Sequence, residues 1–203
     1  MREVTWTFVL TALVICVTPG TGALFTLAAA LGRGARAGVL AAFACTLGTV
    51  PHAVAALTGL AAVLHASGVA FQAVKYAGVA YLLWMAVSIW RDTGALQVDT
   101  ASTPSSFRSV ITTGITANLL NPKLTIFFFA FLPQFVPAGS DGTLARMAGL
   151  SGVFMVMTFL TFAAYAVAAG ALRDRVLTRP QLVNRIRKVF AASFVALSAR
   201  LAL

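Results

Sequence analysis

The sequence predicts an all-α integral membrane protein with six transmembrane helices, arranged as two inverted three-helix repeats. Of its 203 residues, 60% are hydrophobic and only 10% are charged, and the mean hydropathy is +0.91. A soluble domain has about a quarter charged residues, because its surface faces water. In a bilayer every backbone polar group needs a partner within the protein, which favours helices. The apolar residues form long runs of the kind that cross a membrane, without the alternation typical of barrel strands. The six runs cover residues 4–31, 37–64, 69–89, 107–136, 144–172 and 189–203.

The N-terminal run has some features of a secretory signal peptide. Arg2 precedes apolar residues from Trp6 to Val17. No small-residue cleavage motif follows, however, and the run continues to Leu31. We therefore expect a retained first helix.

The net charge of +10 indicates membrane topology rather than nucleic-acid binding. Most lysines and arginines fall in or beside the odd-numbered connections between the predicted spans, and Lys123 falls near the middle of a span. The positive-inside rule then places the odd connections in the cytoplasm and both termini on the other side. The odd connections contain Arg33, Arg36, Arg91, Arg108, Arg173, Arg175, Arg179, Arg185, Arg187 and Lys188, and the opposite side has Arg2, Lys75, Arg146 and Arg200.

The long polar stretch at residues 91–108 divides the chain into two halves. Its glycine, proline, serine and threonine content is typical of a linker. Within a single transmembrane domain, residues 1–90 then form a first three-helix repeat and residues 109–203 a second, joined by a cytoplasmic linker. Because each half has an odd number of spans, the second half enters the membrane the opposite way up, as in transporters built from inverted repeats.

The first helix of each half is interrupted near its middle. Residues 18–22 read Thr-Pro-Gly-Thr-Gly, and residues 118–123 read Asn-Leu-Leu-Asn-Pro-Lys. Proline removes a backbone donor and clashes with the preceding turn. One proline alone would indicate a simple kink, but matched breaks in two inverted halves indicate a transporter's binding site. The residues expected to bind substrate are Thr18, Pro19, Gly20, Thr21, Gly22, Asn118, Asn121, Pro122 and Lys123.

Lys123 is the residue whose placement in the membrane costs the most free energy, because a charge at mid-span must be paired or hydrated. We predict that it faces the translocation pathway and attracts an anionic group such as a carboxylate; the alternative is a side chain that snorkels outward. All five acidic residues fall in loops or at a terminus, so no carboxylate is predicted within the membrane.

His52 is the candidate for proton coupling, because histidine titrates near physiological pH. The alternative is a neutral histidine hydrogen-bonded to a neighbouring helix. The sequence has no metal-ligand motif, carboxylate pair or serine–histidine arrangement. We therefore predict a protein that is not an enzyme and has no metal or cofactor. Cys16 and Cys45 fall in predicted helices, where thiols are usually packing residues.

Several segments resemble motifs of the LysE/RhtB amino-acid exporters. Residues 18–20, followed by Gly-Arg-Gly-Ala-Arg-Ala-Gly at 32–38, look like the first motif of that family. Residues 118–123, which lead into Phe-Leu-Pro-Gln-Phe at 131–135, look like another. Residues 75–82 are similar to the family's third helix and residues 199–203 to its ending, so the likeness covers essentially the whole chain.

The resemblance implies a bacterial inner-membrane exporter of amino acids or their relatives, driven by the proton motive force. In the inner membrane, the charge distribution then predicts periplasmic termini. Two positions depart from the family pattern. Thr21-Gly22 stands where relatives usually have Pro-Asn, and Thr49 stands where relatives often have the acid of a G-D-x-x-H segment, with His52 retained. If that acid carries the coupling proton in relatives, coupling must differ here.

We therefore expect secondary-active export of a neutral or acidic amino acid, such as one like homoserine or threonine, because no buried acid would hold a second ammonium group. Lys123 would neutralise the carboxylate, while Asn121, Thr18 and Thr21 would donate or accept hydrogen bonds. The expected partners are the substrate, protons and the lipid bilayer. We expect no binding to nucleic acid, and the sequence leaves both a monomer and a homo-oligomer possible. A membrane-embedded enzyme and a passive channel for a small polar solute are the alternatives.

Overall fold

The computed structural model describes four continuous stretches of the chain. Within them every regular element is helical. The predicted spans 69–89 and 189–203 and most of the linker at 91–108 lie outside these stretches. The stretches are residues 2–18, 20–66, 106–136 and 142–171; single helical positions at 69, 72, 73, 76, 79, 80, 83, 84, 87, 188, 192, 195 and 199 are also described.

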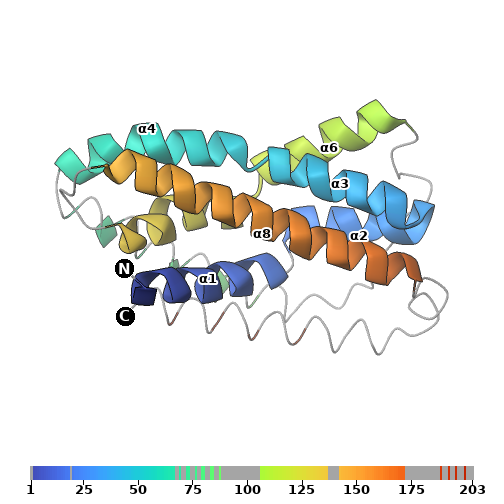
Figure 1. Ribbon diagram of the computed structural model, residues 1–203, viewed down its shortest axis with the longest axis horizontal. Coiled ribbons are helices and arrows are strands. Elements are labelled where there is room, and N and C mark those ends of the chain that lie inside the picture. The colour runs from blue at the N-terminus through green and yellow to red at the C-terminus, as the bar shows by residue number, and fades with distance from the viewer. Residues whose placement is uncertain are drawn as a thin grey trace.

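The first predicted span consists of two helices, α1 (Arg2–Val17) and α2 (Thr21–Arg33), which meet at an angle of 53°. Gly20 caps α2 in an extended conformation, without a side chain to bond the free N–H groups of the first turn. The predicted break near the middle of this span is therefore confirmed (Figure 1).

A sharp turn at Gly34 sends the chain back into the bundle. Its φ of +89° lies in the left-handed region, which glycine adopts without steric cost. The return path consists of α3 (Ala35–Leu47) and α4 (Val50–Ala66). We expected one uninterrupted helix here, but a turn at Gly48 separates the two, and Pro51 has no N–H to continue the helical ladder. The bend is slight, since Ala35–Gly59 still qualifies as a single membrane-spanning helix.

The second break repeats the geometry of the first. Helix α6 (Phe107–Leu119) begins at the Ser106 side chain, which accepts a hydrogen bond from Ser109 N. After a bend of 53°, the chain continues as the short helix α7 (Pro122–Ile126). A π-helical turn, η1 (Phe127–Phe131), and a 3-10 turn, η2 (Leu132–Phe135), complete this span.

The last described element is the 29-residue helix α8 (Thr143–Ala171), which runs the length of the molecule (Figure 1). By length and composition, α8 and Ala35–Gly59 can each cross a membrane, and each of the two bent pairs can form one further span. Four of the six predicted spans thus correspond to helices in the described stretches.

The described helix ends fall into two groups at opposite ends of the molecule (Figure 1). The α2–α3 turn, the start of α6 and the end of α8 lie at one end of the molecule (Figure 1). The start of α1, the end of α4 and the start of α8 lie at the other. Arg33, Arg36 and Arg108, assigned to odd connections, belong to the first group of helix ends.

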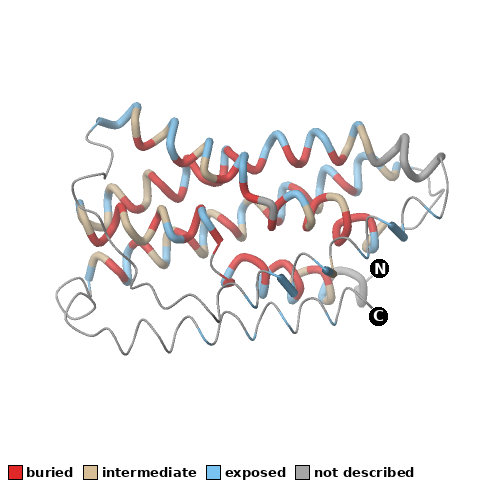
Figure 2. The backbone as a smooth tube through the Cα atoms, turned by 180° about the vertical axis from the view of Figure 1, so that it is seen from behind, coloured by how far each residue is buried: buried red, intermediate tan, exposed pale blue. Residues whose placement is uncertain are grey.

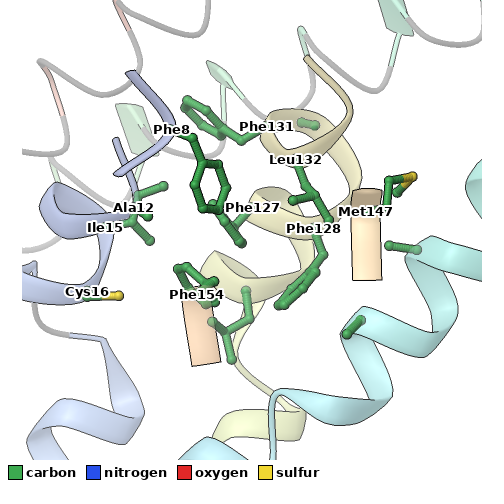
Figure 3. Close-up of a cluster of buried hydrophobic side chains, with 14 residues drawn as sticks. Phe8, Ala12, Ile15, Cys16, Phe127, Phe128, Phe131, Leu132, Met147 and Phe154 are labelled. Atoms are coloured by element: carbon green, nitrogen blue, oxygen red, sulfur yellow. The ribbon is translucent and has the colours of Figure 1, made fainter. Parts of the chain in front are cut away.

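Aromatic and small side chains pack the interior, while apolar side chains such as Trp6, Val156 and Leu160 are exposed. Buried positions recur between exposed ones along the helices (Figure 2). Phe127 of η1 stacks on Phe154 of α8 with ring centroids 3.9 Å apart. This aromatic core lies beside the C-terminal half of α1, as Figure 3 shows for Ile15, Cys16 and the surrounding rings. An apolar exterior around a close-packed interior is the arrangement expected in lipid.

Candidate functional site

The Lys123 side chain reaches across from α7 to the broken end of α1. Its Nζ donates hydrogen bonds to Thr18 O at 2.7 Å and to Ile15 O at 3.0 Å. Only 3% of Lys123 is exposed. Carbonyl oxygens at a helix C-terminus have no helical partner and carry partial negative charge, so they stabilise a buried ammonium group without a carboxylate.

His52 of α4 makes the corresponding contact with the broken end of α6. Its Nε2 lies 3.1 Å from Asn118 O, and its Nδ1 lies 3.3 Å from Thr125 Oγ1. Because a carbonyl only accepts, Nε2 carries a proton, and in the neutral imidazole Nδ1 accepts from the Thr125 hydroxyl. The imidazole also stacks on Phe128, with ring centroids 6.4 Å apart and planes 11° apart.

Proline explains why both carbonyls are available. A helical residue normally donates its N–H to the carbonyl four positions earlier, and proline has no N–H. Pro19 therefore leaves the Ile15 carbonyl without its helical donor, and Pro122 does the same to Asn118. In each case a basic side chain from the opposite half of the chain supplies a donor. Asn118 O also accepts the Asn121 N–H within the tight turn.

Asn118 and Asn121 join the residues of the second break to one another and to α3. Asn121 Oδ1 accepts from Lys123 N and so caps α7, while Asn121 Nδ2 donates to Asn118 Oδ1 at 3.2 Å. Asn118 Nδ2 in turn donates to Cys45 O of α3 at 2.6 Å. Both asparagines are buried, so the structure brings the residues predicted around the second break into one hydrogen-bonded group.

Two glycines of the first break make room for this group. A Cβ atom at Gly22 would lie 2.2 Å from Asn118 Oδ1. A Cβ atom at Gly20 would lie 3.1 Å from Asn121 Nδ2 and 3.2 Å from Lys123 Cε. The glycines predicted to bind substrate are thus in contact with the side chains predicted at the other break.

The remaining predicted residues make local bonds. Thr18 Oγ1 donates to Val14 O at 2.6 Å, and Thr21 Oγ1 donates to Ala117 O at 2.9 Å. Pro122 begins α7, and Pro19 lies outside the described residues. Thr49, at the position where the resemblance implies an acid, is buried and donates to Thr46 O.

Sequence reasoning missed two residues that contact the breaks. The Tyr165 hydroxyl of α8 donates to Val17 O, one more carbonyl at the end of α1. The Thr125 hydroxyl is the partner of His52. Both are ordinary mid-helix residues in sequence, and Tyr165 lies 148 positions from Val17. The one feature of the sequence that could have pointed to Thr125 is its position two residues after Lys123. No group of three metal-binding side chains occurs within the described stretches.

The family model for the LysE type translocator matches residues 13–203. The chain belongs to this family. A homoserine/homoserine lactone efflux protein of Salmonella typhimurium is 29% identical to this LysE-family chain, over 96% of the chain and 94% of the relative. A leucine efflux protein of an Enterobacter species is 28% identical, over 97% of the chain and 94% of the relative. An uncharacterized membrane protein of Vibrio cholerae is 29% identical, over 93% and 91%. No solved structure matches the chain.

Proposed function

We propose that this LysE-family protein is a secondary-active exporter of amino acids or close derivatives across the bacterial inner membrane, driven by the proton motive force. The observation that carries the proposal is the buried Lys123 ammonium group, which is held by carbonyls at the meeting point of two broken helices. The efflux proteins among the relatives support the same class of activity. In this proposal residues 1–90 and 109–203 are inverted repeats joined by a cytoplasmic linker, and both termini are periplasmic.

The substrate carboxylate would bind at Lys123. Two of the three ammonium N–H groups have carbonyl partners in the structure, and a carboxylate, which carries a full charge, would be the stronger acceptor. The free N–H groups at the start of α2, beginning at Thr21, would add favourable partial charge. Asn121, Thr18 and Gly20 line the same junction.

Neutral or acidic amino acids are the proposed substrates, including ones like homoserine or threonine. The described part of the junction offers no carboxylate for a second ammonium group, and Thr49 stands at the family's acid position. His52 is the proposed proton-coupling residue, because its imidazole is the titratable group at the broken end of α6.

An export assay tests this proposal. Purified protein in vesicles would be loaded with each of the twenty amino acids, and efflux would be followed with and without a proton uncoupler. We expect efflux of neutral or acidic amino acids that the uncoupler inhibits. Preferential efflux of lysine or arginine would overturn the proposed specificity, and efflux that is insensitive to the gradient would indicate a passive channel instead.

A further inference from the structure

A series of hydrogen bonds, joined through the covalent frames of Asn118 and Asn121, links His52 to Lys123. His52 Nε2 donates to the backbone oxygen of Asn118 at 3.1 Å. The side-chain oxygen of Asn118 accepts from Asn121 Nδ2, and Asn121 Oδ1 accepts from the backbone N–H of Lys123. The chain ends where Lys123 Nζ meets the α1 carbonyls.

Asn118 is the residue at which this chain passes from backbone to side chain. Its backbone oxygen lacks the helical donor that Pro122 cannot supply, and only 1% of the residue is exposed. The Asn118 side chain is enclosed on three sides. Its amide donates to Cys45 O, and it packs against Gly22 and Gly48. A Cβ atom added at Gly48 would lie 2.8 Å from Asn118 Cβ. A side chain held this closely moves with its backbone.

We propose that Asn118 is a positioning residue that links the protonation of His52 to the position of Lys123, so that proton binding and substrate binding affect each other. This inference rests on the proposed function, in which Lys123 binds the substrate carboxylate. It assigns Asn118 a role different from direct contact with substrate, since both polar atoms of its amide already have protein partners.

The physical basis is a change in one hydrogen bond. Protonation of His52 turns the bond to Asn118 O into a charge-assisted one, which is shorter and stronger. It also places a positive charge at the C-terminus of α6, where the helix dipole favours it. The Asn118 backbone then moves toward His52, and its side chain changes the position of Asn121 and of the Lys123 N–H. By thermodynamic reciprocity, a carboxylate bound at Lys123 changes the proton affinity of His52 by the same factor.

The groups against the His52 imidazole are neutral. They are the Asn118 carbonyl at the end of α6, the Thr125 hydroxyl of α7 and the Phe128 ring of η1. Lys123, at the far end of the hydrogen-bonded chain, is the charged residue in this group. Thr125 joins His52 to α7, the helix that carries Lys123, whereas the Asn118 bond is the contact of His52 that continues through side-chain hydrogen bonds to the Lys123 N–H.

The test measures how the affinity for an amino acid depends on pH. Calorimetry on purified protein would give the Kd of L-homoserine, and of L-leucine, at about pH 5.5 and about pH 7.5, within the range in which histidine side chains change charge. For wild type we expect the two Kd values to differ by about 5-fold or more for at least one of the probes. His52→Gln, which keeps a donor but does not titrate, should bring this ratio close to one.

Two variants interrupt the chain at different points. Asn118→Ala removes the side-chain link, and Asn121→Ser keeps an N-cap for α7 but is too short to reach Asn118. In each variant, the Kd values of the probe at the two pH values should differ by less than about 2-fold. If Asn118→Ala fails to fold, Asn121→Ser decides the question.

Thr112→Val is the matched control, because the Thr112 hydroxyl lies on α6 and donates to carbonyls of its own helix, those of Arg108 and Ser109. It should keep the wild-type ratio. A wild-type ratio near one, a wild-type ratio in Asn121→Ser, or an equal loss in Thr112→Val would overturn the proposed linkage. Failure of the proposed function is separate, since it would appear as absent or gradient-independent efflux by wild type.

Discussion

The carbonyl oxygen of Ile15 accepts a hydrogen bond from Lys123 Nζ at 3.0 Å, although the two residues are 108 positions apart. Pro19 cannot donate to that carbonyl, so the lysine replaces a missing backbone donor. Together with the Thr18 carbonyl, this contact gives the buried ammonium group two acceptors. Lys123 therefore has a structural role at the first break as well as its proposed role in binding.

Replacing Lys123 should separate these roles. Lys123→Ala should abolish export while the protein still inserts into the membrane, because the substrate carboxylate loses its counter-charge. Lys123→Met, which keeps most of the volume but not the charge, should lose export to the same extent. Efflux from vesicles at matched protein levels is the measurement, and near-normal transport by either variant would rule out a role for the charge.

Gly22→Ala should destabilise the junction between α2 and α6. The new Cβ would lie 2.2 Å from Asn118 Oδ1, so the asparagine must move and its bonds to Cys45 and Asn121 weaken. Overpacking of this kind costs about 1–3 kcal/mol. Thermal unfolding in detergent should show a lower Tm, and export should fall with it.

Gly149→Ala is the control for that substitution. Gly149 is also helical, but a Cβ there meets nothing within 4 Å. Alanine in a helix interior is favoured over glycine by about 0.5–1 kcal/mol. The Tm of this variant should therefore equal or exceed that of wild type, and a loss similar to that of Gly22→Ala would contradict the packing argument.

Tyr165→Phe should weaken the attachment of α8 to the end of α1. The variant keeps the ring and its stacking on Phe162 but removes the hydroxyl that donates to Val17 O. Hydrogen bonds between transmembrane helices contribute about 0.6 kcal/mol on average and at most about 1.7 kcal/mol. We expect a small decrease in Tm and slower export, because the carbonyls that hold Lys123 lie on the same helix end. Export at the wild-type rate would show that this contact is only structural.

Thr125→Val should change the pH dependence of export without abolishing transport. The Thr125 hydroxyl donates to neutral His52 and can accept from the protonated form. The bond from the protonated form is charge-assisted and therefore stronger, so loss of the hydroxyl disfavours the protonated form more than the neutral one. Its loss removes one partner from each state and leaves Asn118 O as the polar contact of the imidazole. Thr125→Ser, which restores a hydroxyl, should return the pH profile of efflux toward wild type. Identical profiles in all three proteins would mean that His52 is not the coupling residue.

The sequence was sufficient to predict the class of fold and the location of the breaks. Runs of apolar residues marked the four spans that fall within the described stretches, and proline at 19 and 122 marked the two bends of 53°. These features are local, since helix formation in lipid and the missing proline N–H depend on neighbouring residues only. The chemistry of proline also determines which carbonyls, those of residues 15 and 118, lose their donors.

Only the tertiary structure decided which side chains replace those donors. Lys123 and His52 were visible as costly or titratable residues, but nothing in the sequence paired Lys123 with Ile15 or His52 with Asn118. Tyr165 and Thr125 were not expected to take part at all. The reason is physical: lipid and the protein interior are similarly apolar, so hydropathy does not show which face of a helix meets another helix. The partners of a broken helix end depend on helix packing between the two halves, and that is a property of the assembled bundle.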